Sequence, residues 1–272
     1  MITSAQNGKI KRIANLLKKG KARREEGLFV SEGKKMFLEV LRQFPERIEE
    51  AVFIEAALAE IKEELSDDKE SLNKLSEINY ETADVKVFNQ LAETVTPQGV
   101  IALIKTPQYD LKDFLRGKKL RLLVLDGLRD PGNLGTIVRT AEAAGVSGIL
   151  MSSDCVDITN PKVVRSTMGG ILRVPYVYAE SLSESLDELK KASEACGRCL
   201  KVYATALHNE AVMFDEIGYD TDTAIIIGNE ANGVTNDMIE YADKCILIPM
   251  EGKVESLNAS VAAALVMYEM RR

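Results

Sequence analysis

The chain has 272 residues, of which 46% are apolar, and it carries a formal net charge of −7. This length allows one large domain or two modest ones, and the acidic balance argues against indiscriminate binding to nucleic acid. No stretch reaches the roughly 18 consecutive apolar residues that span a bilayer, and the first residues lack the apolar core of a signal peptide. Four cysteines in a chain of this length do not indicate a disulfide framework. We therefore expect a cytoplasmic protein without a membrane partner.

The first expected element is a basic amphipathic helix over residues 4–24. Its apolar residues Ile10, Ile13, Leu16 and Leu17 recur at helical spacing. The first 24 residues contain eight Lys or Arg side chains and no acidic one. Such a cluster attracts phosphates, but a solvated helix face carries the same charges. The pattern is compatible with an RNA-facing surface and with a plain solvated one.

A small α/β domain is predicted for residues 1–105, because strand-like and helix-like runs alternate along it. The polar stretch 66–79 is expected to hold a charged loop, and residues 81–89 a short strand and the start of a helix. Residues 106–118 contain a proline, a glycine and mixed charges without a long apolar period, which predicts a linker. The main strands are expected at 28–31, 48–54 and 100–104, and the main helices at 32–42 and 55–65.

Residues 119–272 are predicted to form a second α/β domain. Strands and helices alternate here too, which predicts a mainly parallel sheet with right-handed crossovers. The expected strands are 120–126, 146–151, 171–178, 201–206, 224–227 and 245–248, and the expected helices are 134–144, 160–168, 183–195 and 257–271.

Two strands of this domain end in polar loops that contain glycine. The strand Ala224–Ile227 is followed by Gly228–Gly233, and the strand Cys245–Ile248 by Pro249–Ser256. Ligands bind at the carboxyl ends of the strands in such sheets, and glycine allows a ligand to approach the backbone closely. These loops are therefore the first candidates for a binding site.

Three sequence motifs, in this order, carry a resemblance to a known family. They are N-L-G-T-I-V-R at 133–139, G-N-E-A-N-G at 228–233, and I-P-M-E-G-K-V-E-S-L-N-A-S-V-A at 248–262. Together they resemble the motifs of the SpoU-type (TrmH-like) RNA ribose 2′-O-methyltransferases of the SPOUT superfamily. The resemblance implies a deep trefoil knot, with the strand Cys245–Ile248 and its following loop in the threaded region.

The first domain carries a second resemblance. The runs R-R-E-E-G-L-F-V-S-E-G at 23–33 and T-P-Q-G-V-I-A at 96–102 resemble the domain similar to ribosomal protein L30e that precedes many such methyltransferases and binds RNA. This resemblance implies RNA as the partner, and it favours ribosomal RNA over transfer RNA.

The reaction that the resemblance implies is methyl transfer from S-adenosyl-L-methionine to a ribose 2′-hydroxyl. A sulfonium is a good leaving group, so no metal is needed. Catalysis must align the reacting atoms and help the hydroxyl to lose its proton. No G-x-G-x-x-G follows the first strand of either half, which disfavours a Rossmann-type site. By motif match, the cofactor-binding residues are expected to be Thr205, Gly228, Ile248, Met250, Ser256, Leu257 and Asn258.

Arg139 is the leading candidate for a catalytic residue. The family assigns this arginine a role near the 2′-hydroxyl, sometimes as a base. A guanidinium stays protonated in proteins and has no acceptor atom, so a milder role is to bind the adjacent phosphate or to stabilise developing alkoxide charge. Glu230 could accept a hydrogen bond from the substrate, pin Arg139 or cap its own loop. Asn133 is interpreted as a loop organiser. N-capping explains one of Ser256 and Asn258.

The remaining features are interpreted without a metal site. Cys196 and Cys199 form a lone C-x-x-C, and zinc would need two more ligands in a chain whose one histidine is His208. The small residues Ala259 and Ala262–Ala264 of the last helix allow close packing, and members of the family are usually dimers, so we expect a homodimer. The alternatives are a transfer RNA 2′-O-methyltransferase, a non-catalytic RNA-binding relative and a Rossmann-like nucleotide enzyme.

Overall fold

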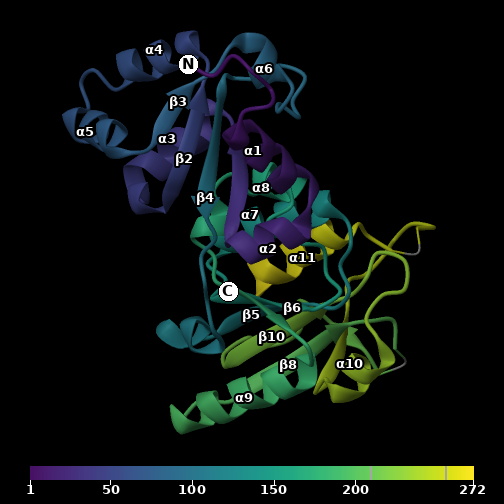
Figure 1. Ribbon diagram of the computed structural model, residues 1–272. Coiled ribbons are helices and arrows are strands. Elements are labelled where there is room, and N and C mark those ends of the chain that lie inside the picture. Colours follow the sequence, from purple (N-terminus) through teal and green to yellow (C-terminus); the bar gives the residue numbers. More distant parts are fainter. Residues whose placement is uncertain (209, 255) are drawn as a thin grey trace. The chain divides into compact units, whose positions relative to one another are not determined.

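The computed structural model describes residues 1–208, 210–254 and 256–272. Its contacts divide the chain into two compact units (Figure 1). The first unit comprises Met1–Pro107 and Thr159–Gly169, and the second comprises Gln108–Ile158 and Gly170–Arg272. The segment Thr159–Gly169, which was expected in the second domain, thus packs with the first.

The first unit is built on a four-stranded sheet with the order β1-β4-β2-β3. Strand β4 is antiparallel to both of its neighbours, and β2 and β3 are parallel. The strands are β1 (Leu28–Glu32), β2 (Ile48–Phe53), β3 (Tyr80–Thr82) and β4 (Val100–Lys105); the helices are α1 (Gly8–Lys18), α2 (Gly20–Glu26), α3 (Lys34–Gln43), α4 (Glu55–Glu64), α5 (Lys69–Glu77), α6 (Val85–Asn89) and α8 (Pro161–Thr167), with a 3-10 turn η1 (Pro45–Arg47).

The single helix predicted over residues 4–24 is two helices, α1 and α2. They are separated at Lys19, whose backbone is extended (φ −120°, ψ 109°). The break turns the Arg23 side chain inward, where it is 5% exposed. Its guanidinium donates to the carbonyl of Leu16 (2.8 Å) and to the Thr159 hydroxyl (3.0 Å). Arg23 thereby satisfies a carbonyl at the end of α1, which the helix itself leaves without a partner.

The basic cluster of the first 24 residues is partly neutralised inside the unit. Lys9 Nζ lies 2.5 Å from Glu50 and 2.7 Å from Glu81, and Arg12 pairs with Glu26 at 2.7 Å. Charges that were available to phosphate by sequence count are therefore engaged in protein ion pairs. The cations of this stretch that remain exposed are Lys11, Lys18, Lys19, Lys21 and Arg24.

Helix α5 lies in the polar stretch 66–79, for which the sequence predicts only a charged loop at 66–70. The Asp68 carboxylate accepts from the Ser71 backbone N–H and caps the helix. Leu75 is buried, but most of the helix is polar and faces solvent. Apolar periodicity was therefore too weak to reveal it.

The second unit is built on a seven-stranded sheet with the order β7-β6-β5-β10-β8-β11-β9. Every adjacent pair in it is parallel, which confirms the predicted α/β class. The strands are β5 (Arg121–Leu125), β6 (Gly148–Ser152), β7 (Tyr176–Ala179), β8 (Leu200–Thr205), β9 (Val212–Met213), β10 (Asp222–Ile227) and β11 (Lys244–Leu247); the helices are α7 (Pro131–Ala144), α9 (Leu182–Ala195), α10 (Asn236–Tyr241) and α11 (Ala259–Glu269), with 3-10 turns η2 (Leu111–Arg116) and η3 (Gly170–Leu172).

The centre of this sheet forms the core of the second unit. All six residues of β10 are buried, because a parallel strand covered on both faces has no solvent side. Leu123 and Ile225, side by side in the ladder, are completely buried. The core therefore fixes the positions of the strand ends, where the polar loops begin.

The prediction of a strand over residues 171–178 is wrong for the first half of that range. Gly170–Leu172 is a 3-10 turn, in which Arg173 N and Val174 N both donate to the Gly170 carbonyl. Only Tyr176–Ala179 pairs with β6. A short buried apolar run is compatible with either structure, and here the turn buries Ile171.

The segment predicted as a linker contains ordered structure. Asp110 and Asp113 form a capping box at η2, and Phe114 is 1% exposed. A Cβ atom on Gly148 would lie 2.1 Å from the Phe114 ring, so the ring packs directly on β6. Within the described residues, no helix is long and apolar enough to cross a membrane.

Candidate active site

The three sequence motifs converge at the carboxyl edge of the parallel sheet. Residues 126–130 join β5 to α7, Gly228–Gly233 follow β10, and residues 248–258 join β11 to α11. Strands β5 and β10 are neighbours, and α11 packs against α7. Parallel strands present their carboxyl ends on one edge, so the fold itself brings these motifs together.

A chain of side-chain hydrogen bonds joins one residue from each motif. Asn258 Oδ1 accepts from the Ser260 backbone N–H (2.9 Å) and caps α11. Asn258 Nδ2 donates to Asn133 Oδ1 (2.9 Å), and Asn133 Nδ2 donates to Glu230 Oε1 (3.0 Å). Because the cap requires an oxygen at its end of the chain, the orientation of both amides is determined.

The Glu230 carboxylate receives three N–H donors. Besides Asn133, the backbone of Asp130 donates to Oε1 (3.0 Å) and that of Arg129 to Oε2 (3.3 Å). Burial alone would raise the pKa of Glu230, but the hydrogen bonds from the Asn133 side chain and from the backbone of Glu230 itself, Asp130 and Arg129 outweigh it and hold the pKa below its usual value. Glu230 is therefore an ionised residue that holds the backbone directly before the start of α7.

The loop after β10 closes on itself. Asn229 and Gly233 exchange two backbone hydrogen bonds of 2.9 Å, while the Asn229 side chain accepts from Ala231 N and donates to the carbonyl of Gly127 (2.7 Å). A Cβ atom on Gly228 would lie 2.0 Å from the carbonyl carbon of Gly233. Glycine is therefore required where the loop folds back.

A cavity of about 410 Å³ lies between this loop and the start of α11. Its size lies in the usual range for small-molecule sites, ~300–1,000 Å³. Among the described residues that line it, Glu230 is the one charged side chain. A single negative charge in a largely apolar cavity suits a ligand with a positive centre, such as a sulfonium. The lining includes all seven expected cofactor residues, Thr205, Gly228, Ile248, Met250, Ser256, Leu257 and Asn258.

The expected cofactor residues differ in how they are held. Thr205 donates its hydroxyl proton to the Ile226 carbonyl (2.8 Å), so it acts first as a brace between β8 and β10. Asn258 is the helix cap. The Ser256 side chain makes no hydrogen bond to the described residues. Glu255, which belongs to the same loop, lies outside the described residues.

Arg139 is not brought into this cavity. It lies on α7, six residues after Asn133, and six residues along a helix lead to a different face. Asn133 is buried, whereas Arg139 is exposed. Across the described ranges, no hydrogen bond or ion pair holds the guanidinium, so it makes neither with Glu230. Arg139 lies one turn beyond Thr136, which lines a separate hollow beside α11.

Several residues that support the site were missed at the sequence level. Asp126, at the end of β5, accepts from the Thr235 backbone N–H (2.8 Å). Ser152 accepts from Gly127 N (2.8 Å) and donates to Asp154 (2.6 Å). The available signal was a polar residue directly after a buried strand. In the described part of the chain, no cluster of metal-binding side chains occurs.

The parallel sheet and the three converging strand-end motifs define the class of SpoU-type methyltransferases. Residues 121–268 match the SpoU rRNA Methylase family, and residues 7–102 match the MRM3-like substrate binding domain. The chain therefore belongs to the SpoU rRNA methylase family.

Individual relatives support this assignment. The chain is 37% identical over 184 residues to the 23S rRNA (guanosine(2553)-2′-O)-methyltransferase RlmP of Bacillus subtilis, covering 68% of this chain and 69% of that one. It is 34% identical to an uncharacterized tRNA/rRNA methyltransferase of Synechocystis sp., covering 100% of this chain and 93% of that one. The AdoMet-bound rRNA methyltransferase of Sinorhizobium meliloti superposes with a TM-score of 0.83 at 27% identity, covering 99% and 96%. The protein is thus an RNA methyltransferase that uses S-adenosylmethionine.

Proposed function

We propose that the protein transfers a methyl group to a ribose 2′-hydroxyl in ribosomal RNA. The observation that carries this proposal is the hydrogen-bonded chain Glu230–Asn133–Asn258, which joins the three motifs beside the cavity. The names of two relatives support the chemistry and the substrate: one methylates 23S rRNA at a 2′-oxygen, and one is described for tRNA or rRNA. Transfer RNA is therefore the second candidate substrate.

The cavity residues are proposed to hold S-adenosylmethionine mainly through their backbone. Gly228 lets the loop after β10 fold back beside the cavity, and the main chain around Ile248 and Leu257 offers N–H and C=O groups. Bound there, S-adenosylmethionine supplies a methyl group on a sulfonium, which leaves without assistance from a metal. The protein then needs to position the ribose oxygen and stabilise the charge that develops on it.

Arg139 is proposed to act on the RNA. An exposed guanidinium without a hydrogen-bond or ion-pair partner among the described residues can bind a phosphate through two parallel N–H groups. It would therefore orient the ribose or stabilise the alkoxide. Glu230 and Asn133 are assigned as positioning residues, because each polar atom they present to the site already has a protein partner.

A homodimer is proposed to complete the site. Helix α11 exposes Val261 (47%), Leu265 (40%) and Tyr268 (47%), which is unusual for apolar side chains of one helix. The hollow beside these side chains also includes Thr136, one turn from Arg139. A second copy packed on this face would bring its own chain near Arg139. We also propose that the second unit forms a trefoil knot and that the protein is cytoplasmic.

The proposal is tested by supplying the protein with labelled S-adenosylmethionine and total RNA. A 2′-O-methyl group protects the next phosphodiester from alkali, so label is expected in alkali-resistant dinucleotides of the ribosomal RNA fraction. Label confined to transfer RNA would favour the second candidate. No label in any RNA, although the protein binds S-adenosylmethionine, would show a non-catalytic relative.

A further inference from the structure

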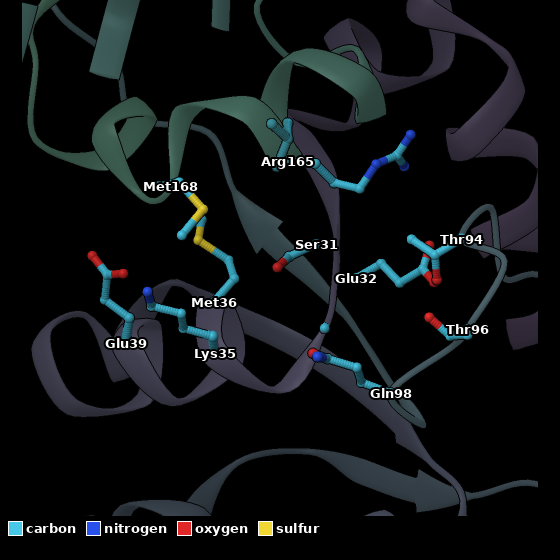
Figure 2. Close-up of a pocket in the computed structure, with 12 residues that line it drawn as sticks. Ser31, Glu32, Lys35, Met36, Glu39, Thr94, Thr96, Gln98, Arg165 and Met168 are labelled. Carbon is cyan, nitrogen blue, oxygen red and sulfur yellow. The ribbon is translucent and has the colours of Figure 1, made fainter. Parts of the chain in front are cut away.

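The first unit contains a cavity of its own, apart from the proposed active site. Its volume is about 370 Å³, and it is bounded by β1, the start of α3, the loop before β4, and α8 (Figure 2). Helix α8 and Met168 come from the segment Thr159–Gly169, which is inserted in the sequence of the second unit but packs in the first. All walls of the cavity therefore belong to one compact unit.

A buried hydroxyl opens into this cavity without a partner. Ser31 is 2% exposed, and among the described residues nothing is hydrogen-bonded to its Oγ atom. It lies on β1, opposite Ala102 of β4, and Figure 2 places it at the centre of the lining side chains. An unpaired buried hydroxyl is costly, so a ligand that hydrogen-bonds to it is favoured.

Two methionines form one wall beside Ser31. The ends of Met36 and Met168 point toward one another in Figure 2. Thioethers are polarizable and pack well against aromatic rings. Met168 is 40% exposed and has a left-handed backbone (φ 50°), which is rare for a residue other than glycine. Its side chain is held at the cavity although its backbone conformation is unfavourable.

The opposite side presents hydrogen-bonding groups. Gln98 Oε1 accepts from the Lys34 backbone N–H (2.9 Å) at the start of α3, which leaves its Nε2 without a protein partner among the described residues. Thr96 adds a hydroxyl. Together with Ser31, these groups can hydrogen-bond to the edge of a heterocycle, as flat polar ligands require.

The rim of the cavity carries two basic side chains, Lys35 and Arg165, and two acidic ones, Glu32 and Glu39. Lys35 is exposed, and no ion pair involves it among the described residues. Arg165 donates from Nη1 to Glu93 (2.8 Å), while its Nε and Nη2 make no hydrogen bond to the described residues. The acidic Glu32 is already occupied by the backbone N–H of Glu93 (3.0 Å) and by the Thr94 hydroxyl. Lys35 and the remaining N–H groups of Arg165 can therefore contact a phosphate, while Glu32 and Glu39 balance their charge.

We propose that this cavity binds one unstacked nucleobase of the RNA substrate. The base packs against Met36 and Met168, its edge meets Ser31 and Gln98, and the flanking phosphates meet Lys35 and Arg165. Proteins that read RNA specifically take bases from bulges and loops in this way, because the grooves of the RNA helix reveal little. The inference rests on the proposed function, since it takes RNA as the substrate.

Fluorescence anisotropy with five labelled RNA hairpins tests the proposal on the full-length protein. Four hairpins carry a single bulged A, C, G or U, and the fifth is fully paired. At least one bulged hairpin is expected to bind about tenfold more tightly than the paired one, which corresponds to the packing of one base. Equal affinity for all five would overturn the proposal.

Three substitutions locate the effect. Met168→Gly removes one of the two methionine side chains of the wall. It also relieves the strain of the left-handed backbone conformation at this position, so the fold is retained or stabilised. Ser31→Ala removes a hydroxyl that has no hydrogen-bond partner among the described residues, and Gln98→Glu keeps the oxygen that Lys34 needs. Each is expected to reduce the preference for the bulged hairpin several-fold, whereas Val85→Ala and Ser76→Ala, elsewhere in the first unit, leave it unchanged. A preference that survives all three substitutions would place base recognition elsewhere.

Turnover measurements separate this inference from the proposed function. Met168→Gly is expected to raise the KM for RNA and to leave kcat and the Kd of S-adenosylmethionine unchanged. Methyl transfer with no preference for bulged hairpins would contradict only the proposed base pocket. A preference for bulged hairpins without methyl transfer would contradict only the proposed enzymatic function. Full competition by a free nucleoside monophosphate, with no preference among the hairpins, would reassign the cavity to a small molecule.

Discussion

The side chain of Asn133 has its two functional atoms committed in opposite directions. Its oxygen accepts from Asn258, and its nitrogen donates to Glu230. An amide is the one ordinary side chain of this size that can do both. Asn133 is also 8% exposed, so neither partner can be replaced readily by water.

The substitution Asn133→Asp tests this network. It places a second carboxylate beside Glu230 and removes the donor that Glu230 accepts, so the free energy of unfolding should fall by about 2–4 kcal/mol. Urea denaturation at neutral pH measures the loss. Asn232→Asp, on the exposed part of the neighbouring loop, is the matched control. A loss no larger than in the control would contradict the assigned network.

Glu230 gives the network a dependence on pH. Its pKa in the folded protein lies below the usual value, because hydrogen bonds outweigh burial. Its contribution to stability is thus fully present above the unfolded pKa of about 4.3 and is lost as the pH falls through the folded pKa. The carboxylate is exposed to solvent, so the contribution is below about 1 kcal/mol. Glu230→Gln should therefore lose less stability than the parent between pH 7 and pH 3 in chemical denaturation, and parallel curves would argue against the assignment.

Arg139 carries the prediction for catalysis. Arg139→Ala should lower methyl transfer at least about 100-fold, because a charge that stabilises the transition state is removed. The Kd of S-adenosylmethionine should stay within a few-fold, since Arg139 does not line the cavity. Lys191→Ala, an exposed cation on α9, is the control. Near-normal turnover of Arg139→Ala would end its assignment.

At the scale of elements, the turn after β10 sets the shape of the cavity. Gly228 has no space for a Cβ atom, whereas none of the described residues lies within 4 Å of the equivalent position on Gly252. Gly228→Ala should therefore open the loop and raise the Kd of S-adenosylmethionine by about tenfold or more. Gly252→Ala, in the next motif loop, should change it little. Isothermal titration measures both, and equal values for the two variants would refute the proposed fit.

The same elements show what the sequence predicts and what it leaves open. The convergence of the motifs was predictable, because polar loops follow buried runs and parallel strands share one carboxyl edge. The start of α7 was placed too late, at Leu134, although Asp130 and Pro131 are a helix-start signal. Asn133 consequently appeared to be a loop residue. Its bonds to Glu230 and Asn258 join residues about a hundred positions apart, which no local pattern reveals.

Other differences arise where tertiary packing overrides local pattern. The first helix divides at Lys19, and the break lets Arg23 turn inward to reach Leu16 and Thr159. Residues 159–169 were predicted to belong to the second domain. Their contact with Arg23 spans more than a hundred positions, so no local pattern places them in the first unit. For Arg139 the difference has another origin. The motif match predicts that it is catalytic, whereas the fold of a single chain leaves its side chain exposed.

At the scale of the whole molecule, the exposed face of α11 leads to a prediction on assembly. Val261→Glu should place a charge on the face that carries Leu265 and Tyr268 and convert the proposed dimer to a monomer. Light scattering coupled to size-exclusion chromatography measures the mass. Methyl transfer should fall at least about tenfold if the second copy completes the site. Lys191→Glu serves as the control, and a parent protein that is already monomeric would contradict the dimer.

The packing of Thr159–Gly169 with the first unit means that the polypeptide passes between the units three times, near residues 107, 158 and 169. No single cut therefore yields two intact halves. A fragment that starts after residue 107 would lack the surroundings of α8 and expose Val163 and Val164, which are buried in the full chain. Loss of the amino-terminal half during evolution would thus require compensating changes in the segment between β6 and η3. Limited proteolysis at the three junctions should likewise give fragments that stay associated until the protein is denatured.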